Sequence, residues 1–535
     1  MYLTQGLRHA AQIRPREQST VFRDRRRIWS ETADRVAQVA GGLKEAGVRP
    51  GDRVAILALN SDRYFELMYA IPWLGAAMVP VNTRLATPEI RYILEDSGAR
   101  VLFIDDAMKA HASALAGQMP TVEAVFYLDD DAPPGGTRPY EELAAAPEIA
   151  DAGAGGETLA GLFYTGGTTG KSKGVMLSHN NLVWNAMNAI AGVYHDQDTT
   201  YIHAGPMFHL ADGGQTFGVT ACGGRHVFVP RFDAADCLQT MEQEKVTHAV
   251  YVPTMLNMLV NHPAAGDVDL SSLKYIVYAA SPMPEGVLRK ALQVFPNCQF
   301  IHAYGMTEAA PVLTVLPPRY TTLEGPYAGR IKSCGLAAHT AELKIVDENR
   351  REVPRGTIGE VAAKGPMIML GYWDKPQETA AVLQDGWYYS GDAAYMDDEG
   401  FVFIVDRLKD MIISGGENVY STEVENAISL MPGVAEVAVI GIPDAKWGES
   451  VHAVIVLCAR ANLTAEAVIE HCRTRIAGYK CPRSVEFRDA PLPLSGAAKV
   501  LKRDLREPFW KAAQKAGVLN TSDLSATTSE RGVRR

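Results

Sequence analysis

The chain alternates between segments with helical spacing of apolar residues and short runs that are almost entirely apolar. Ser30 to Gly47 places its apolar side chains on one helical face and ends on a glycine, and the apolar run Arg53 to Leu59 follows. The pattern repeats as a helix over Pro88 to Gly98 and a strand over Val101 to Asp105. Continuous apolar strands are typical of parallel sheets covered by helices on both faces. The sequence therefore predicts an α/β fold with a large N-terminal domain of parallel-rich sheets.

Two stretches interrupt this alternation and predict where the chain changes character. Asp129 to Gly156 is rich in small residues and acids, and a polar run near Val405 to Gly416 leads into a Gly-Gly pair. We predict an N-terminal domain over 1–408 and a small α+β C-terminal domain over 409–519. The Ser/Thr/Arg-rich end, 520–535, is expected to be disordered.

Composition and charge exclude several classes of protein. The 535 residues carry 62 acidic and 52 basic side chains, a net charge of -10, so nucleic acid is not expected as the main partner. The longest apolar run, Leu67 to Val81, is too short to span a bilayer, and no signal peptide is evident, so a cytoplasmic protein is expected. The seven scattered cysteines form no Cys-x-x-Cys pair and are read as reduced thiols. The oligomeric state is left open, with a homodimer as one alternative.

A glycine- and threonine-rich loop carries the first chemical signal. Residues Tyr164 to Gly174 read Tyr-Thr-Gly-Gly-Thr-Thr-Gly-Lys-Ser-Lys-Gly, after an apolar strand over Leu159 to Phe163 and before a helix-like stretch. Glycines let backbone N–H groups point inward, and hydroxyls and lysines add donors and charge, so the loop is a candidate phosphate cradle. The P-loop of nucleotide triphosphatases is disfavoured because Thr165 occupies its first required glycine.

Four further segments follow in a fixed order along the chain. They are His302 to Glu308 (His-Ala-Tyr-Gly-Met-Thr-Glu), Trp387 to Asp392 (Trp-Tyr-Tyr-Ser-Gly-Asp), Asp406 to Asn418 (which contains Asp-Arg-Leu-Lys-Asp and Ser-Gly-Gly-Glu-Asn), and Pro493 to Lys502. Together with the loop, they resemble the signature motifs of the adenylate-forming enzymes, a superfamily of acyl- and aryl-CoA synthetases, peptide-synthetase adenylation domains and beetle luciferases. Three positions depart from the usual motifs: Gly166, Ser172 and Ala498 stand where serine, proline and glycine are usual.

The resemblance implies a binding site for ATP and Mg²⁺. In the family the tyrosine stacks on adenine, the threonine after it binds the α-phosphate, the glutamate holds Mg²⁺, and the aspartate and arginine bind ribose. Carried over residue by residue, these roles and those of the loop fall on Thr165, Gly166, Gly167, Thr168, Thr169, Gly170, Lys173, Tyr304, Gly305, Thr307, Glu308, Asp392 and Arg407.

The resemblance also implies a ligase that works in two steps with a mobile C-terminal domain. A carboxylate and ATP would give acyl-AMP and pyrophosphate, and CoA would then give acyl-CoA and AMP. The catalytic residues expected are Lys499, Glu308 and Thr165; Lys409 matches the hinge, and Gly415 and Gly416 would face the pantetheine arm of CoA. Lys499 is assigned rather than Lys502, which is expected on the solvated face.

The predicted acyl pocket is mainly apolar and aromatic. Its candidate residues are His209, Phe208, Met255, Ala280, His302 and Gly305. An apolar pocket favours a fatty acid of medium to long chain, with an aromatic or arylalkenoic (cinnamate-like) acid as the alternative. Amino acids are disfavoured, because His209 stands where amino-acid-activating relatives have an aspartate; whether it lines the pocket or is a core residue stays open. Transfer of the adenylate to a carrier protein, and a non-catalytic nucleotide-binding protein, are the competing hypotheses.

Overall fold

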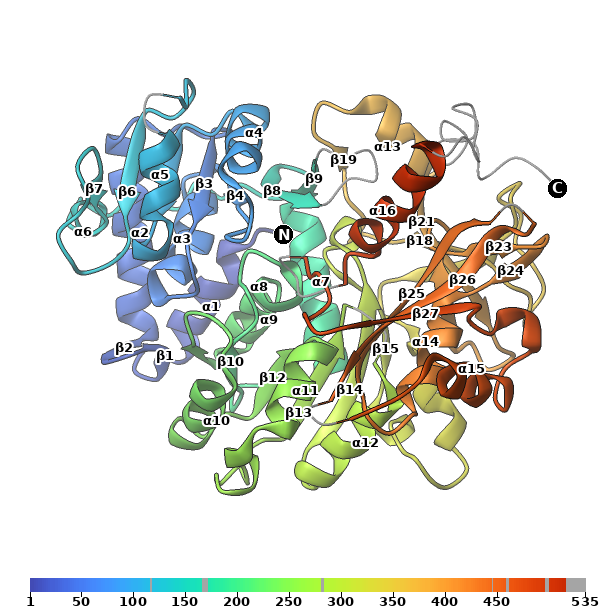
Figure 1. Ribbon diagram of the computed structural model, residues 1–535. Coiled ribbons are helices and arrows are strands. Elements are labelled where there is room, and N and C mark those ends of the chain that lie inside the picture. Colours follow the sequence, from blue (N-terminus) through green and yellow to red (C-terminus); the bar gives the residue numbers. More distant parts are fainter. Residues whose placement is uncertain are drawn as a thin grey trace.

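The computed structural model describes residues 1–115, 118–165, 172–280, 283–444, 446–458, 461–495 and 500–515. In these residues the strands form four sheets, two large and two small. Figure 1 shows the blue N-terminal elements at one side of the molecule and the orange and red C-terminal elements at the other. Within the described ranges, no helix is long and apolar enough to cross a membrane.

The first large sheet has eight strands in the order β19-β9-β8-β4-β3-β5-β6-β7. Its central strands are parallel, whereas β9 and β19 join one edge in antiparallel fashion. The bounds are β3 Arg53–Leu57, β4 Ala77–Pro80, β5 Val101–Ile104, β6 Ala124–Tyr127, β7 Arg138–Pro139, β8 Leu159–Thr165, β9 Lys173–Ser178 and β19 Gly371–Tyr372.

The second large sheet has nine strands in the order β16-β15-β14-β13-β12-β10-β11-β1-β2. It is parallel from β14 to β1 and antiparallel at both ends. The bounds are β1 Gln18–Phe22, β2 Arg25–Ile28, β10 Thr200–His203, β11 Arg225–Phe228, β12 His248–Tyr251, β13 Tyr275–Ala279, β14 Gln299–Gly305, β15 Val312–Leu316 and β16 Leu336–Ala337.

The two small sheets are mostly antiparallel. The third sheet contains β17 Glu342–Val346, β18 Gly359–Lys364, β20 Leu383–Gln384, β21 Trp387–Met396 and β22 Val402–Arg407. The fourth contains β23 Ile412–Ser414, β24 Glu417–Val419, β25 Val434–Asp444, β26 Gly448–Leu457 and β27 Ser484–Arg488. The strand that ends the third sheet is thus followed, after four residues, by the first strand of the fourth.

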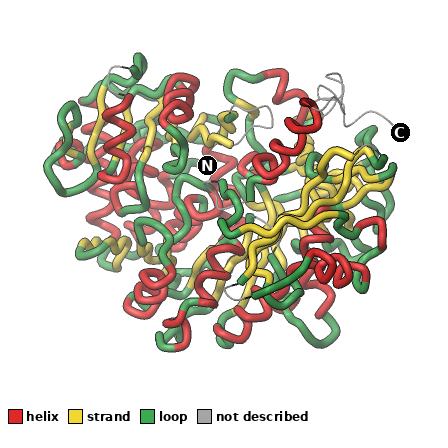
Figure 2. Tube along the Cα trace, viewed as in Figure 1, coloured by secondary structure: helices red, strands yellow, loops and turns green. Residues whose placement is uncertain are grey.

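Helices cover the sheets, and Figure 2 shows them in red around the yellow strands. In the N-terminal part they are α1 Thr4–Ile13, α2 Trp29–Glu45, α3 Asp62–Trp73, α4 Thr87–Ser97, α5 Lys109–Leu115, α6 Glu141–Ala144, α7 His179–Val193, α8 Leu210–Gly213, α9 Gln215–Cys222, α10 Ala234–Gln243, α11 Pro253–Asn261, α12 Glu285–Val294 and α13 Pro376–Val382. The C-terminal ones are α14 Ser421–Ser429, α15 Ala465–Arg473 and α16 Lys502–Lys515.

The predicted fold class is confirmed, and one local prediction is wrong. The structure has a large α/β part with mixed, parallel-rich sheets and a small C-terminal part. The stretch after the glycine-rich loop is the strand β9 rather than a helix, because Val175 and Leu177 are both buried while Met176 between them is not, a period of two. The helix α7 begins only at His179. The expected disordered tail, 520–535, lies outside the described residues.

Candidate functional site

A cleft of about 290 Å³ gathers side chains from several of the predicted motifs. Its lining includes Thr165, Lys173, Glu308, Arg407 and Lys409, which come from the first two sheets, the third sheet and the hinge segment. Thr165 ends β8, and Glu308 follows β14, so both lie beyond the carboxyl ends of strands from parallel sheets. Ligands of open α/β sheets bind at such ends. The cleft is therefore the candidate nucleotide site.

The glycine-rich loop connects two antiparallel neighbours at one wall of this cleft. Thr165 and Lys173 are register partners in β8 and β9, so the ends of the loop lie side by side. The ammonium of Lys173 lies 5.0 Å from the centroid of the Tyr372 ring. The predicted phosphate ligands Gly166, Gly167, Thr168, Thr169 and Gly170 lie outside the described residues.

The predicted ribose-binding pair is assembled by one β-hairpin. Asp392 on β21 and Arg407 on β22 are register partners, and Arg407 Nε lies 3.3 Å from Asp392 Oδ1. The hydroxyl of Tyr304 donates a 2.7 Å hydrogen bond to Asp392 Oδ2. Asp392 is buried whereas about half of the Arg407 side chain is exposed. The structure therefore brings together the aromatic face predicted for adenine and the carboxylate predicted for ribose.

The motif around Glu308 owes its shape to a close backbone approach. A Cβ on Gly305 would lie 1.8 Å from the carbonyl oxygen of Pro311, so no side chain fits there. Thr307 begins the short 3₁₀ helix Thr307–Ala309, which carries Glu308. Glu308 Oε1 accepts a 2.9 Å hydrogen bond from the hydroxyl of Tyr372. Tyr372 contacts two predicted site residues, and motif reasoning had not identified it.

The segment that carries the predicted adenylation lysine is a hairpin whose tip is not described. Leu494 and Val500 form an isolated antiparallel bridge, and Leu501 N donates a 2.8 Å hydrogen bond to Pro493 O. Arg84 Nη1 donates to Ser495 O at 3.4 Å, which brings this hairpin against the N-terminal part of the chain. Lys499 lies outside the described residues.

The expectation that Lys502 lies on the solvated face is wrong. Only 16% of its side chain is exposed, and its ammonium lies 2.7 Å from Glu425 Oε1 and 2.6 Å from Ser421 Oγ. Lys502 is the first residue of α16, which packs against β25. This packing turns the first side chain of the helix inward, toward the two acceptors on α14.

The hinge and the loop that follows it show two distinct features. Lys409 lines the cleft, and its carbonyl accepts a 3.4 Å hydrogen bond from Arg506. Gly415 and Gly416 have φ angles of 64° and 85°, a left-handed conformation that favours glycine. A Cβ on Gly415 would lie 2.7 Å from the indole ring of Trp447.

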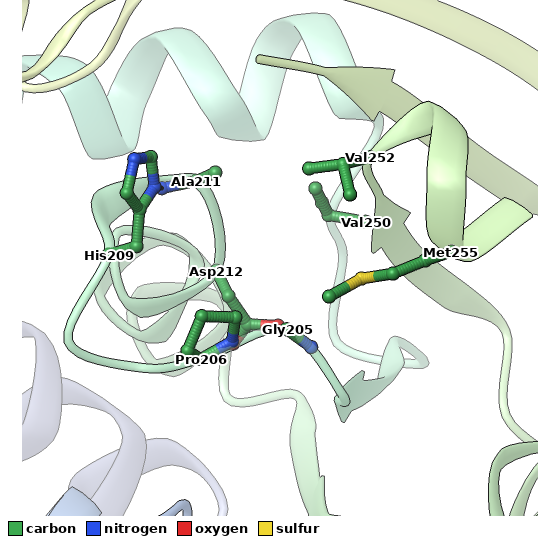
Figure 3. A pocket seen from close by; sticks show the side chains of 8 residues that line it. All are labelled: Gly205, Pro206, His209, Ala211, Asp212, Val250, Val252 and Met255. Atoms are coloured by element: carbon green, nitrogen blue, oxygen red, sulfur yellow. Dashed lines mark hydrogen bonds between the residues drawn. The ribbon is translucent and has the colours of Figure 1, made fainter. Parts of the chain in front are cut away.

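A second, much smaller cavity lies between the loop after β10 on one side and the strand β12 with the helix α11 on the other (Figure 3). Its walls are mainly aliphatic, and Figure 3 shows Met255, Val250 and Val252 facing Gly205, Pro206 and the short helix α8. The complete lining is Gly205, Pro206, His209, Ala211, Asp212, Val250, Val252 and Met255. This cavity is the candidate acyl pocket.

Two of the six predicted pocket residues line this cavity. His209 and Met255 do, whereas Phe208, Ala280, His302 and Gly305 are not among its lining residues. His302 is half-buried and packs against Tyr278: the two ring centroids are 4.6 Å apart, and loss of hydration lowers the pKa of His302 to about 4. Because His209 Nδ1 accepts a hydrogen bond from Ala211 N at 3.1 Å, the proton of the neutral ring is on Nε2.

The loop that forms one wall of the small cavity is held by two buried polar groups. The side-chain amide of Asn60 donates to the carbonyls of His203, Gly205 and Val229 at 3.2, 2.7 and 3.1 Å, and its oxygen accepts from Met207 N at 2.8 Å. Asp212 Oδ2 accepts from Gly205 N at 3.0 Å. Asp212 is buried, and its other oxygen, Oδ1, lies 2.5 Å from His203 Nδ1. The contacts of Asn60 join residues more than 140 positions apart in sequence, so no local motif indicates them.

Comparison with known proteins gives a consistent result. Residues 7–373 match the family of AMP-binding enzymes, and residues 423–499 match the AMP-binding enzyme C-terminal domain. A feruloyl-CoA synthase of Amycolatopsis sp. is 40% identical over 90% of this chain and 94% of its own, and the long-chain-fatty-acid–CoA ligase FadD13 of Mycobacterium tuberculosis is 34% identical over 94% and 97%. The solved structure of the anthranilate CoA ligase AuaEII with anthranoyl-AMP matches with a TM-score of 0.88 and 26% identity, over 96% of this chain and 98% of that one.

Proposed function

Since this chain belongs to the AMP-binding enzyme family and is an AMP-forming acid–thiol ligase that uses ATP and CoA, we propose that the acid it activates is an arylalkenoic acid. The observation that carries this proposal is the small cavity between the loop after β10, the strand β12 and the helix α11. It is far smaller than the candidate nucleotide cleft, which favours a short, planar acyl group over a long flexible chain.

The lining of the cavity supports the same choice. Met255 and the two valines present an aliphatic wall opposite the loop of Gly205 and Pro206. A thioether beside an aromatic ring is a favourable contact, worth about 0.3–1.5 kcal/mol. The feruloyl-CoA synthase relative, at 40% identity, acts on an acid of this class.

A fatty acid of medium to long chain is the second candidate. The aliphatic lining would gain about 0.8 kcal/mol for each CH₂ group that it buries. The similarity to a long-chain-fatty-acid–CoA ligase at 34% identity favours this alternative. The two candidates differ in the depth of pocket that they need, and this difference makes them separable by experiment.

In the first step, the substrate carboxylate attacks the α-phosphorus of ATP and pyrophosphate leaves. The chain positions the reactants and offsets phosphate charge: Tyr304 offers its ring to adenine, Asp392 and Arg407 bind ribose, and Thr165 and Lys173 bind phosphate oxygens. The remaining loop residues and Thr307 would add donors to the phosphates. Lys499, assigned from its motif, would lie at the carboxylate and α-phosphate oxygens.

The residues present fit a magnesium ion that arrives with the nucleotide. Among the described residues, no cluster of three or more His, Cys, Asp or Glu side chains could hold a metal by itself. Mg²⁺ at phosphates usually takes one or two carboxylates and completes its shell with phosphate and water oxygens, and Glu308 supplies one carboxylate in the cleft. When bound, the ion neutralises charge on the phosphates.

In the second step, the CoA thiolate attacks the carbonyl carbon of the acyl adenylate, a thioester forms, and AMP leaves with the electron pair of the broken C–O bond. We place the boundary of the mobile domain at 408/409, so that it turns about Lys409. Gly415 and Gly416 would then face the pantetheine arm. Their bare backbone suits the close approach of a narrow chain.

The substrate is tested by carboxylate-dependent ATP–pyrophosphate exchange over cinnamic, hydroxycinnamic, benzoic and fatty acids, with AMP release measured with and without CoA. Cinnamate-type acids should give the highest kcat/KM. The substitution Met255→Trp, which fills the cavity, should lower kcat/KM for these acids at least tenfold and leave kcat/KM for acetate unchanged. A highest kcat/KM with fatty acids of medium or long chain would establish the second candidate. Release of AMP without any effect of CoA would indicate another acceptor.

The assignment of Lys499 is tested by separating the two steps. Lys499→Ala should abolish adenylation and leave thioester formation from a preformed acyl adenylate largely intact. Lys511→Ala, on the exposed face of α16, is the matched control and should change neither step. An equal loss in both steps of Lys499→Ala would contradict the assignment.

A further inference from the structure

We infer that Tyr372 is a positioning residue for the adenylation step: its hydroxyl fixes the carboxylate of Glu308 and its ring fixes the ammonium of Lys173. The inference rests on the proposed roles of Glu308 and Lys173. The side chain of Tyr372 would thus hold the carboxylate of Glu308 and the ammonium of Lys173 at a fixed distance from each other. The segment that contains Tyr372 carries none of the motifs discussed above.

The contacts of Tyr372 are direct on both sides. Its hydroxyl lies 2.9 Å from Glu308 Oε1, and its ring centroid lies 5.0 Å from Lys173 Nζ. The side chain is 7% exposed and lines the same cleft as the two residues that it touches. A phenol stays protonated near neutral pH and therefore donates its hydrogen bond to the carboxylate. An ammonium within about 6 Å of a ring centroid is attracted by the electrons of the ring.

The backbone holds Tyr372 in place independently of these contacts. It belongs to β19 and pairs with Val175, two residues from Lys173 on β9. Tyr372 N donates a 2.9 Å hydrogen bond to Thr379 Oγ1, and a Cβ on the preceding Gly371 would lie 2.8 Å from Thr379 Cγ2. The ring is thus fixed by a strand, and it can act as a support for groups that come from other elements.

The backbone of the metal-binding residue is tied to the same segment. Met369 lies three residues before Tyr372, and its N–H donates a 2.9 Å hydrogen bond to the carbonyl of Glu308. The 3₁₀ turn of Glu308 is therefore fixed at its backbone and at its carboxylate by residues 369–372. Carboxylates that bind metals are commonly oriented by a hydrogen-bond donor behind them, and the hydroxyl of Tyr372 is such a donor.

A comparable arrangement occurs beside Arg407, which lines the cleft. There the hydroxyl of Tyr304 donates to Asp392 Oδ2 at 2.7 Å, so each carboxylate expected to touch the nucleotide is held by a tyrosine hydroxyl. The bond to Glu308 is made to Oε1 and leaves Oε2 for a ligand, whereas the second oxygen of Asp392 faces Arg407 Nε. Preorganised groups of this kind cost no reorganisation when the charge develops.

The inference is tested with Tyr372→Phe, which removes the hydroxyl and keeps the ring, and with Tyr372→Leu, which removes both. The readouts are Mn²⁺ affinity, by electron paramagnetic resonance in the presence of α,β-methylene-ATP, and AMP affinity, by calorimetry without metal. Tyr372→Phe should weaken Mn²⁺ binding about tenfold, the lower end of the effect of losing such a partner, and leave AMP binding within twofold. Tyr372→Leu should in addition weaken the binding of α,β-methylene-ATP measured without metal, because the ring beside Lys173 is lost.

The control is Tyr127→Phe, which removes another tyrosine–carboxylate contact, 3.3 Å to Asp106, outside the cleft. It should leave both affinities unchanged. Wild-type Mn²⁺ affinity in Tyr372→Phe would overturn the inference, and an equal loss of Mn²⁺ and AMP binding would reduce Tyr372 to a structural residue and overturn it too. If Glu308→Gln binds Mn²⁺ like the wild type, the proposed role of Glu308 fails, and the inference fails with it.

Discussion

Replacing Lys502 by methionine tests what the buried cation at the start of α16 contributes to stability. Its ammonium contacts Glu425 and the hydroxyl of Ser421, and that hydroxyl donates a 2.7 Å hydrogen bond to Asp406 Oδ2. Asp406 belongs to the last strand of the third sheet, whereas the other three residues belong to the C-terminal part. Lys502 thus balances two acids, one on each side of Lys409 in the sequence, which is the proposed hinge residue.

The expected loss is about 3 kcal/mol. Removing one partner of a buried ion pair typically costs about 3–5 kcal/mol, because the remaining charge stays buried without compensation. We take the lower end because the side chains of Lys502 and Glu425 are 16% and 18% exposed. A loss of 3 kcal/mol is about a hundredfold change in the equilibrium constant for opening. The control, Lys511→Met on the same helix, breaks a well-exposed pair with Glu507 and should have little measurable effect.

The loss should also depend on pH in a defined direction. Burial already holds the pKa of Glu425 above its usual value, and removing Lys502 raises that pKa further. A carboxyl whose folded pKa exceeds its unfolded pKa destabilises the fold when it is ionised, and the penalty disappears as the pH falls through the folded pKa. The loss in Lys502→Met should therefore be smaller at pH 5 than at pH 8.

Hydrogen–deuterium exchange of peptides from α14 and α16 measures the local free energy of opening in all three proteins. Exchange in Lys502→Met should be about a hundredfold faster than in the wild type at pH 8, and Lys511→Met should match the wild type. If Lys502→Met exchanges no faster than Lys511→Met, or if its loss grows at low pH, the argument for a stabilising buried cation is wrong.

Three further outcomes are expected. Asn60→Ala should lower the free energy of unfolding by about 2–3 kcal/mol and raise the KM for the acid, since it strands buried backbone groups of the cavity loop; an unchanged urea midpoint would contradict this. Burial lowers the pKa of His195 to about 4, so between pH 7 and pH 5 this histidine takes up a proton in the unfolded chain but stays neutral in the folded one. The free energy of unfolding should therefore fall by about 2 kcal/mol over this range, and His195→Gln should show a flatter pH dependence of its urea midpoint. Gly415→Ala should cost roughly 1 kcal/mol, displace Trp447 and slow thioester formation while ATP–pyrophosphate exchange persists; equal loss in both half-reactions would count against it.

The apolar pattern predicted the N-terminal elements closely. The strands over Arg53 to Leu59 and Val101 to Asp105 and the helices over Ser30 to Gly47 and Pro88 to Gly98 are all present, with ends displaced by at most two residues. The two strands are buried on both faces and the two helices on one face, so burial determines the pattern of each. The strand β9 was missed because its first residue, Lys173, belongs to a glycine-rich loop motif and breaks the apolar pattern.

The motifs identified residues that the structure brings close together, but they did not predict what supports them. Asp392 contacts both Tyr304 and Arg407. Tyr372 and Asn60 escaped detection because their partners lie in other strands and loops, and only the register of the sheets brings them together. Lys502 was misjudged for a related reason, because the face that a helix turns inward is set by what it packs against.

The position of β1 in the second large sheet has a consequence for synthesis of the chain. Its partner along one edge is β11, which begins at Arg225, about 200 residues after β1 ends at Phe22. At typical rates of about 5–20 residues per second, the ribosome needs roughly 10–40 s to complete that partner. During this interval the N-terminal hairpin has one unpaired edge on a nascent chain, where an exposed strand edge can pair wrongly. Synonymous changes that slow translation between these strands should therefore lower the soluble yield without altering a single residue.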